Sequence, residues 1–505
     1  MSAELEAKLI PGDGYSPPDL GRWLPRAVVA PQPVRHLDAT YYDTADLELA
    51  RWGVTLRHRS GDPGRAWTLK LPDHVGGELI AREELTFDGP EDAPPAEATD
   101  LVRGFTRGRP LERVARLGTT RAPVHVRDAD GRLLVEVVHD SVTVTETGAA
   151  SGDGQFREIE VEVAADDDAG HEALRSVVAA LIDAGGRADP PLPKLVRALG
   201  ARAQEPPSVV VDPVGRKSST ADVIRYLIAG SVSQLLVHDP GVRLGVDPEA
   251  VHQYRVATRR LRSDLRTFSQ LLDRRRAGAL TEELRWLGDA VGHVRDLDVL
   301  AARLTAHTDS LLEPYRPSAE QLLARVRSSR LEARRDLLDA LRTERYDRTM
   351  GVLIGVASDP PIDPGSVKRS TRPMGRLAGR LVKRRWTQVA HAVKAGGAHP
   401  SDDQLHQIRI AAKRCRYAAE AVAPVVGGDA ARFAAGVAKI QALLGDYNDT
   451  VVAEAWLREA GLELTECRVV IGGLIAKEQA ERVRLRAKWP ATWERASERE
   501  ARDWF

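Results

Sequence analysis

The chain has 505 residues, of which 43% are hydrophobic and 29% charged, a composition that fits two or three folded domains and excludes wholesale disorder. No apolar stretch reaches the ~20 residues of a membrane-spanning helix, and the first ten residues lack the basic start of a signal peptide, so we expect a cytoplasmic protein. The two cysteines are too few for a disulfide scaffold or a zinc site built from cysteines. The net charge is zero, but residues 1–205 sum to −11 and residues 206–505 to +11, which predicts two parts with different electrostatic tasks.

Residues 1–200 are predicted to form a domain rich in strands. Short runs of alternating polar and apolar residues recur there, separated by clusters of Gly, Pro and Asp. The runs expected to be strands are 3–9, 54–59, 67–71, 124–127, 134–139 and 158–163, and helices are expected at 100–117 and 169–184. Residues 201–220 are predicted to be a linker between this domain and the rest of the chain.

The predicted strands carry charges on one face. Side chains at positions i, i+2 and i+4 of a strand share a face, so Glu4, Glu6 and Lys8 point one way while Leu5 and Leu9 point the other. Other residues that share a face along a strand are Glu158, Glu160 and Glu162; Arg57 and Arg59; Thr68 and Lys70; Arg82 and Glu84; and Glu136 and Asp140.

Two interpretations of these charges stay open. The sheet could have one wet face whose charges pair across strands. Alternatively, the apolar faces could pack outward against helices, and the charged faces would then line a small closed barrel. In a barrel of that kind the bases would hold phosphate oxygens, and the carboxylates would hold Mg²⁺ or Mn²⁺.

From residue 221 onward the apolar residues follow a helical period. One stripe comprises Val251, Tyr254, Thr258, Leu261, Leu265, Phe268 and Leu272. The sequence also repeats itself, because VHQYRVATRRLR at 251–262 matches LHQIRIAAKRCR at 405–416, and GHVRD at 292–296 matches GDYND at 445–449. Two motifs at matching spacing predict a duplicated helical unit.

A second stripe on the same predicted helices is basic. It comprises His252, Arg255, Arg259, Arg262 and Arg266 in the first copy and His406, Arg409, Lys413 and Arg416 in the second. Another segment carries a similar row of basic residues, Arg369, Arg372, Arg376, Arg380 and Lys383. A solvated helix face usually interleaves glutamates at i±4, and these rows contain almost none. Arginine forks grip phosphate oxygens, so the rows predict a binding site for a polyanion. The rows also lack the aromatic residues on which nucleic-acid bases stack, which disfavours nucleic acid as the ligand.

Several motifs of the N-terminal part, taken in order, resemble the CYTH domain of the triphosphate tunnel metalloenzymes. They are ELEAK at 4–8, YYDT at 41–44, LRHR at 56–59, WTLK at 67–70, REE at 82–84, EIE at 158–160 and PKLVR at 193–197. The resemblance covers residues 1–200. It implies an α+β domain built on an antiparallel eight-stranded β tunnel or barrel, which hydrolyses or rearranges a triphosphate.

The resemblance also implies roles for individual residues. Glu4, Glu6, Glu158 and Glu160 are the implied ligands of Mg²⁺ or Mn²⁺, with Asp140 as a further acidic candidate. The implied triphosphate ligands are Lys8, Arg57, Arg59, Lys70, Arg82, Arg121 and Lys194. Lys8 and Lys194 are the implied catalytic residues, and Lys194 would stabilise the charge that develops on the phosphate.

The repeated motif of the C-terminal part resembles the CHAD domain, a helical domain with conserved histidines that often follows CYTH. This resemblance implies an all-α domain over 221–505, with two pseudo-symmetric four-helix bundles and a basic cleft for inorganic polyphosphate. The implied ligands are His252, Arg255, Arg259, Arg260, Arg262, Arg266, Arg376, Arg380, Lys383, His406, Arg409, Lys413, Arg414 and Arg416.

Together the two resemblances predict a cytoplasmic, metal-dependent triphosphatase fused to a polyphosphate-binding domain. Its expected partner is inorganic tripolyphosphate or polyphosphate, and polyphosphate granules are the candidate place of association. Two other functions remain open: a non-catalytic scaffold that binds polyphosphate, and a class IV-type adenylate cyclase, since the tunnel family includes cyclases.

Overall fold

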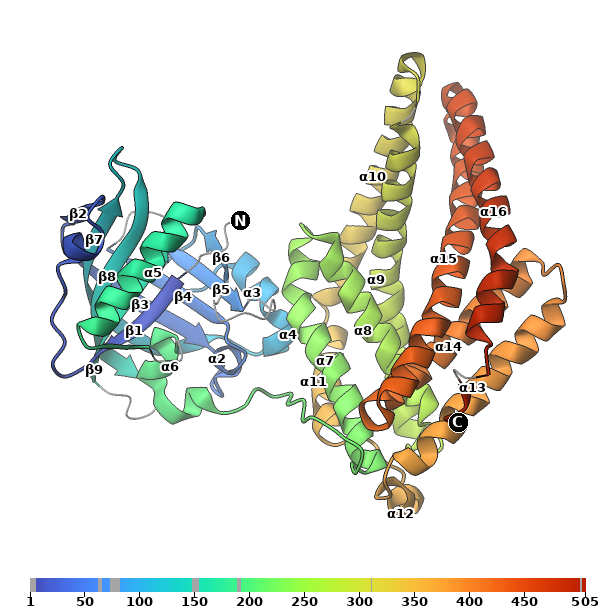
Figure 1. Cartoon of the computed structure of the whole chain (residues 1–505), viewed down its shortest axis with the longest axis horizontal. Helices are drawn as coiled ribbons and strands as arrows, with labels where there is room; N and C mark the ends of the chain where they lie inside the picture. Colours follow the sequence, from blue (N-terminus) through green and yellow to red (C-terminus); the bar gives the residue numbers. More distant parts are fainter. Residues whose placement is uncertain are drawn as a thin grey trace. The chain divides into compact units, whose positions relative to one another are not determined.

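A computed structural model of the chain describes residues 6–61, 66–72, 82–147, 154–188, 192–309, 311–499 and 502–505. The chain divides into two compact units, Met1–Ser208 and Val209–Phe505 (Figure 1). The first unit is built on a β-sheet with short helices, and the second is entirely helical in its described residues. The predicted fold class, a β-rich domain followed by an all-α domain, is confirmed.

The first unit contains a ten-stranded antiparallel sheet. Its strands are β1 (Glu6–Pro11), β2 (Val28–Pro31), β3 (Arg35–Asp43), β4 (Thr55–Ser60), β5 (Trp67–Pro72), β6 (Arg82–Phe87), β7 (Glu112–Arg127), β8 (Leu133–Thr147), β9 (Gln155–Val163) and β10 (Gly186–Ala188). The strand order is β10-β1-β9-β8-β7-β3-β4-β5-β6, and β2 pairs with β7. In the described residues this path is open, because no pairing joins β6 to β10.

The predicted strand count of eight is therefore wrong, because this sheet has ten strands. The two short strands β2 and β10, of four and three residues, are defined by pairing with β7 and β1 rather than by an alternating pattern of their own. Sequence alternation needs several residues to become visible, so it did not predict them.

Short helices complete the first unit. They are α1 (Leu20–Trp23), α2 (Glu48–Arg51), α3 (Ala96–Leu101), α4 (Arg103–Thr106), α5 (Asp168–Asp183) and α6 (Lys194–Leu199), followed by the 3₁₀ turn η1 (Gly200–Gln204). The prediction of a helix at 169–184 is confirmed by α5.

The helix predicted at 100–117 is wrong in its second half. Helix α4 ends at Thr106, the next two residues take positive φ (56° at Arg107 and 70° at Gly108), and β7 begins at Glu112. Val114 and Leu117, three residues apart, fit a helical stripe, whereas Ala115, Leu117 and Thr119 are buried in the alternation of a strand. Pairing with β3 decides for the strand, since Leu117 lies opposite Ala39.

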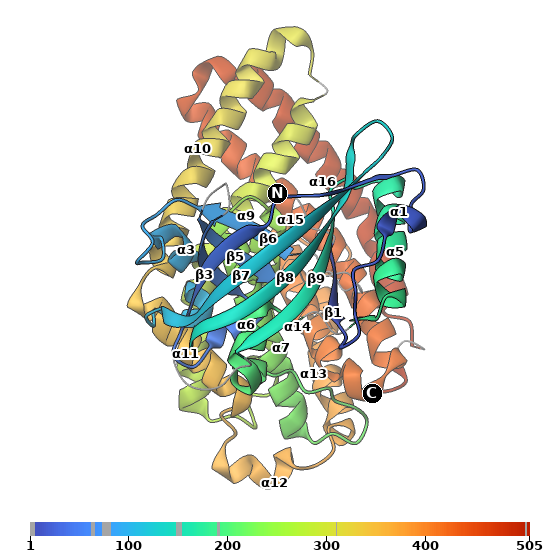
Figure 2. The ribbon, with the colours of Figure 1, turned by 90° about the vertical axis from the view of Figure 1, so that its left-hand side faces the viewer.

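The outer face of the sheet packs against α5, which lies beside the long curved strands β8 and β9 in Figure 2. Ile159 and Val161 of β9 pack there with Val177 and Leu181 of α5, and all four side chains are buried. Because alternate residues of a strand face opposite ways, Glu158, Glu160 and Glu162 point to the concave face. The charged interior predicted from the alternation follows from this packing.

Helix α6 is fixed at one end of the concave face. Leu195, Val196 and Ala198 are buried in a cluster with Tyr41 of β3. Ala203 of η1, which belongs to the predicted linker, is buried in the same cluster. The first residue of α6, Lys194, is thereby held close to the charged face of the sheet.

The second unit consists of ten α-helices in its described residues. They are α7 (Thr220–Leu244), α8 (Pro248–Thr267), α9 (Arg274–Thr308), α10 (Arg316–Leu341), α11 (Glu344–Ser358), α12 (Val367–Ser370), α13 (Gly375–Gly396), α14 (Asp402–Val426), α15 (Gly428–Glu463) and α16 (Arg468–Ala496). No helix in the described chain combines the length and apolarity that a bilayer-spanning segment needs.

The helices form two sets of four, α7–α10 and α13–α16, in which each helix packs against the next (Figure 1). The two copies of the repeated motif lie at equivalent places, on α8 and α14, and these two helices contact each other. The apolar stripe from Val251 to Leu272 is buried throughout. The row from Arg369 to Lys383 does not lie on one helix, because α12 ends at Ser370 and α13 begins after Pro373.

Candidate functional site

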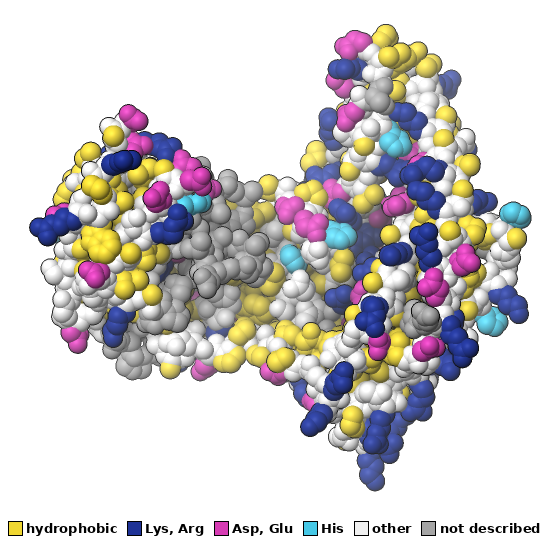
Figure 3. Space-filling view, viewed as in Figure 1, with side chains coloured by type: hydrophobic (Ala, Val, Ile, Leu, Met, Phe, Trp, Pro, Cys, Tyr) yellow, Lys and Arg dark blue, Asp and Glu magenta, His cyan; other side chains and the backbone are white. Residues whose placement is uncertain are grey.

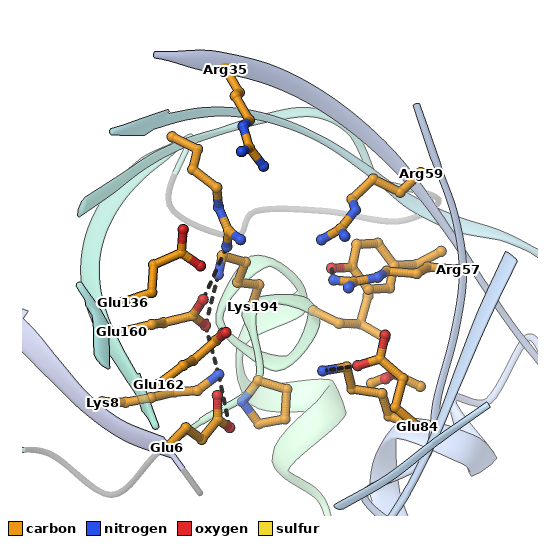
Figure 4. A pocket seen from close by; sticks show the side chains of 16 residues that line it. Glu6, Lys8, Arg35, Arg57, Arg59, Glu84, Glu136, Glu160, Glu162 and Lys194 are labelled. Carbon is orange, nitrogen blue, oxygen red and sulfur yellow. Dashed lines mark hydrogen bonds and ion pairs between the residues drawn. The ribbon is translucent and has the colours of Figure 1, made fainter. Parts of the chain in front are cut away.

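The concave face of the first unit encloses a cavity of about 220 Å³, which is lined mainly by charged side chains (Figure 4). These come from eight strands and from α6. The charged lining residues are Glu6, Lys8, Arg35, Arg57, Arg59, Lys70, Glu84, Arg121, Glu136, Glu160, Glu162 and Lys194. So many charges around one small cavity fit a small, highly charged ligand.

Three carboxylates converge beside one wall of this cavity, which Glu160 lines. Asp140 of β8 and Glu158 of β9 lie opposite each other in the strand register, and Glu160 is two residues further along β9. Each of the three offers an oxygen within 4.8 Å of the others, and all three residues are at least 95% buried. No other group of this kind occurs in the described parts of the chain.

Four cations contact these carboxylates, and three of them, Lys194, Arg121 and Lys8, also line the cavity. Lys194 Nζ lies 3.0 Å from Asp140 and 2.9 Å from Glu160, and it also contacts Glu158. Arg121 donates two hydrogen bonds to Asp140, of 3.0 and 2.7 Å, and a third of 3.0 Å to Glu160. Lys8 donates to Glu160 at 2.8 Å. The buried negative charge is therefore balanced within the protein, as burial of a charge requires.

The proximity of opposite charges shifts pKa values at this wall. Burial alone would lower the pKa of the Lys194 ammonium, but the carboxylates of Glu160, Glu158 and Asp140 outweigh burial and raise it far above its usual value. Burial would raise the pKa of Glu160, but Lys194, Lys8 and Arg121 hold it well below its usual range. Both groups are charged at neutral pH.

The opposite wall of the cavity is basic. Arg57 of β4 donates to the hydroxyl of Tyr41 at 3.5 Å, and its buried Nε has no hydrogen-bond partner in the described residues. Lys70 of β5 is paired with Glu84 of β6 at 2.5 Å, and Arg59 lies two residues after Arg57 on the same face (Figure 4). A buried donor without a partner is costly, so the Arg57 guanidinium fits an anionic ligand.

The cavity brings together most of the residues that the sequence indicated. Glu6, Lys8, Arg57, Arg59, Lys70, Arg121, Glu160 and Lys194 line it, and Asp140 and Glu158 lie behind the Lys194 ammonium. Glu4 and the Arg82 side chain lie outside the described part of the chain. The roles of these residues stay predictions.

Five charged residues were missing from the predicted site, one of which is Glu84 of β6. Glu136 and Glu162 line the cavity and continue the alternation of β8 and β9, so the sequence carried a signal for both. Arg35 also lines the cavity but belongs to no motif. Arg197 of α6 lies 3.3 Å from Glu158, with its guanidinium 4.3 Å from the centre of the Phe156 ring. Only the packing of α6 against β9 reveals this contact.

The residues at the acidic wall fit a divalent metal ion. Mg²⁺ and Mn²⁺ bind hard oxygen donors, and three buried carboxylates with converging oxygens supply them. Glu6 lines the same cavity, and its carboxylate lies 3.6 Å from Lys8. Asp140, Glu158 and Glu160 are therefore the described residues whose oxygens converge closely enough to hold a metal, and Glu6 is a further carboxylate of the cavity.

The helical unit contains a second charged hollow, of about 150 Å³, between α8 and α14. It is lined by Arg259, Arg262, Ser263, Arg266, Ile410, Lys413, Arg414 and Tyr417. Burial and the charges of Arg259, Arg409 and Arg255 lower the pKa of Lys413 to about 7. The basic stripes of the two repeats thus face each other, and their mutual repulsion favours an anion between them.

The second repeated motif, GHVRD or GDYND, contacts basic side chains of the first repeated motif. Arg255 of α8 donates to the Gly292 carbonyl oxygen of α9 at 2.5 Å and lies 3.1 Å from Asp296. His406 of α14 is hydrogen-bonded to Asn448 of α15 at 2.9 Å. The GHVRD and GDYND motifs therefore orient members of the basic stripes.

The other predicted polyphosphate ligands do not all lie at this hollow. Arg260 and Arg416 pair with Glu420, at 2.7 and 2.6 Å. Arg376, Arg380 and Lys383 are exposed on α13 and are not among the residues that line the hollow. A residue absent from the prediction, Arg385 of α13, donates to the Arg266 carbonyl oxygen at 3.3 Å. Lys and Arg side chains are frequent on the visible face of this unit (Figure 3).

Comparison with known proteins agrees with this arrangement. The family model described as the CYTH domain matches residues 4–183, and the one described as the CHAD domain matches residues 227–458. The chain belongs to the CYTH–CHAD proteins. CYTH domains are associated with triphosphate and CHAD domains with polyphosphate, and CYTH tunnel enzymes depend on a metal ion.

One curated protein is similar to this CYTH–CHAD protein over most of its length, and two solved structures are similar over part of it. An uncharacterized protein of Mycobacterium tuberculosis (strain H37Rv) is 34% identical over 443 residues, which are 85% of this chain and 83% of that protein. The crystal structure of the CHAD domain from the plant Ricinus communis is similar at 23% identity and a TM-score of 0.49, covering 58% of this chain and 96% of that one. PptA from Streptomyces chartreusis is similar at 21% identity and a TM-score of 0.45, covering 55% and 100%.

Proposed function

We propose that the CYTH domain hydrolyses inorganic triphosphate, or a related organic triphosphate, in a metal-dependent reaction, and that the CHAD domain binds inorganic polyphosphate. One observation carries the catalytic part. Glu160 lines one wall of a single cavity, with Asp140 and Glu158 converging on it, and the bases Arg57, Arg59 and Lys70 line the other wall. A triphosphate needs both, because its oxygens bind cations of the protein and a bridging metal ion at once.

Each wall has its own part in the reaction. Arg57, Arg59 and Lys70 bind phosphate oxygens and hold the chain of phosphates in one orientation. Arg121, Lys8 and Lys194 balance the charge of the carboxylates and reach the same cavity. Glu6, Asp140, Glu158 and Glu160, with Glu4, would hold the metal ion, which would supply Lewis-acid polarisation of a phosphoryl oxygen. Water attacks the terminal phosphorus, and the bond to the bridging oxygen breaks, which leaves diphosphate and phosphate.

The first test is phosphate release from tripolyphosphate by the full-length protein, with Mg²⁺, with Mn²⁺ and with chelator. We expect turnover with metal only. Glu160→Gln removes a carboxylate from the centre of the acidic wall and should lower kcat by about 10²-fold or more. The matched control is Glu97→Gln, since Glu97 is an exposed residue of α3. Full turnover in chelator, in Glu160→Gln or in the double variant Glu4→Ala, Glu6→Ala would contradict the mechanism.

The same assay separates the alternatives. If neither metal supports turnover while polyphosphate binds tightly, the protein is a polyphosphate-binding scaffold. Incubation with ATP tests the cyclase, because a cyclase releases diphosphate and forms cyclic AMP, whereas a triphosphatase releases phosphate.

The polyphosphate site is tested by binding at a stated salt concentration. Arg262 lines the hollow between α8 and α14, whereas Arg380 is exposed on α13. Arg262→Gln should weaken binding of long-chain polyphosphate about tenfold, and Arg380→Gln by roughly twofold or less. Equal losses would place the ligand along α13 as well.

A further inference from the structure

The ammonium of Lys194 lies where a bound cation would lie. It contacts all three carboxylates of the acidic wall, at 3.0 Å from Asp140, at 2.9 Å from Glu160 and against Glu158. The Lys194 side chain is only 11% exposed. Arg121 and Lys8 approach the same wall but contact two of the carboxylates and one, respectively.

These carboxylates are also the described group whose oxygens converge closely enough to hold a metal ion. The same carboxylate oxygens can therefore either pair with the Lys194 ammonium or coordinate a metal ion. Mg²⁺ requires about six oxygen ligands at close range, so a metal ion cannot take these oxygens while the ammonium remains among them. Two positive charges at that separation would also repel each other strongly in a buried site.

We propose that Lys194 is an internal counter-ion that competes with the divalent metal for Asp140, Glu158 and Glu160, so that metal loading releases its ammonium into the cavity as a phosphate ligand. This inference rests on the metal dependence in the proposed function. The inference goes beyond that function by assigning an order of binding, because the metal has to bind before Lys194 is available to the triphosphate.

The position of Lys194 suits such a change. It is the first residue of α6, its side chain lines the cavity, and the following residue, Leu195, is anchored in the buried cluster. The four-carbon stem of lysine can swing its charge without movement of the backbone. Arg121 and Lys8 stay within reach of Glu160 and limit the charge imbalance during the exchange.

The test is metal affinity in the absence of any phosphate, measured on the full-length protein by Mn²⁺ electron paramagnetic resonance and by calorimetric titration with Mg²⁺. Lys194→Met removes the competing charge and should tighten metal binding by about tenfold or more. Lys194→Gln should tighten it as well, and Lys194→Arg, which keeps the charge, should not. An unchanged or weaker affinity in both neutral variants would overturn the proposal.

The matched control is Lys70→Met. This change removes the same charge from the same cavity, but Lys70 lies at the opposite wall against Glu84. If it tightens metal binding as much as Lys194→Met, the effect is general electrostatics and the proposal is wrong. Should Lys194→Met fail to fold without metal, metal-induced folding followed by circular dichroism would support the proposal, and failure to fold at saturating metal in both neutral variants would overturn it.

These outcomes are separate from those of the proposed function. Tighter metal binding in Lys194→Met without triphosphate hydrolysis by the unaltered protein would uphold the competition and reject the triphosphatase. Metal-dependent hydrolysis with unaltered metal affinity in the Lys194 variants would uphold the triphosphatase and reject the competition.

Discussion

Asp264 is a buried carboxyl on α8 without a full set of partners. It is 3% exposed, and its Oδ2 has no hydrogen-bond partner in the described residues. Burial raises its pKa to about 8, against the opposing charge of Arg260 and with a smaller contribution from Glu420. A carboxyl in this state holds its proton more tightly in the folded protein than in the unfolded chain.

This shift predicts how stability depends on pH. Because the folded pKa lies above the unfolded one, the stability that the bound proton contributes is complete below about pH 4 and is lost as the pH rises to about 8. Asp264→Asn does not titrate, so its free energy of unfolding relative to the unaltered protein should rise over that window by a few kcal/mol. Differential scanning calorimetry at a series of pH values measures the difference. The exposed Asp359→Asn is the control, and a pH-independent difference for Asp264→Asn would contradict the prediction.

At the scale of elements, α8 and α14 place one lysine among arginines. Lys413 has a pKa lowered to about 7 by burial and by Arg259, Arg409 and Arg255. A polyanion favours the charged ammonium. Above pH 7 the free protein must therefore take up a proton to bind with full charge, whereas at lower pH it is already protonated.

We therefore expect polyphosphate affinity to fall as the pH rises from 7 to 9, by up to about tenfold per pH unit for one proton taken up. Lys413→Arg stays charged over this range and should flatten the profile. Dissociation constants at constant salt provide the comparison. The same slope in both proteins would show that Lys413 is not the titrating group.

Helices α9 and α16 are joined by a buried ion pair. Arg303 donates to both oxygens of Glu478, at 2.8 and 2.9 Å through Nε and 2.5 Å through Nη2, and the Glu478 side chain is fully buried. Arg303→Met leaves that carboxylate uncompensated and should lower the free energy of unfolding by about 3–5 kcal/mol. The double variant Arg303→Met, Glu478→Leu should recover most of the loss in denaturant unfolding. A double variant no more stable than Arg303→Met would show that the pair is needed for more than charge balance.

At the scale of the whole molecule, the first compact unit ends at Ser208, whereas the sequence predicts a domain boundary at residue 200. The intervening residues contact the sheet unit. Arg202 donates to the Ala45 carbonyl oxygen at 3.2 Å, Glu205 pairs with Arg51, and Ala203 is buried.

A fragment of residues 1–208 should therefore fold and hydrolyse tripolyphosphate with the kcat of the full chain, while losing retention of long-chain polyphosphate. A fragment of residues 1–200 should melt about 5 °C lower, because it lacks these contacts. Thermal unfolding and phosphate release compare the two. Equal melting temperatures would support the boundary at residue 200.

The sequence alone determined the faces of the elements and the family. Alternation placed Glu158 and Glu160 on one side of a strand and Ile159 on the other, and the 3.6-residue period separated the apolar stripe of α8 from its basic stripe. Both patterns are local, because the backbone geometry of a strand or helix fixes them within a few residues.

Only the tertiary structure decided which charges meet. Lys194 reaches Glu160 across 34 residues of sequence, and Arg385 reaches Arg266 across 119. Arg35 enters the cavity from β3 without any motif. Such contacts depend on the curvature of the sheet and on pairing between distant segments. No local period encodes either of these, because both are set by the burial of apolar side chains over the whole domain.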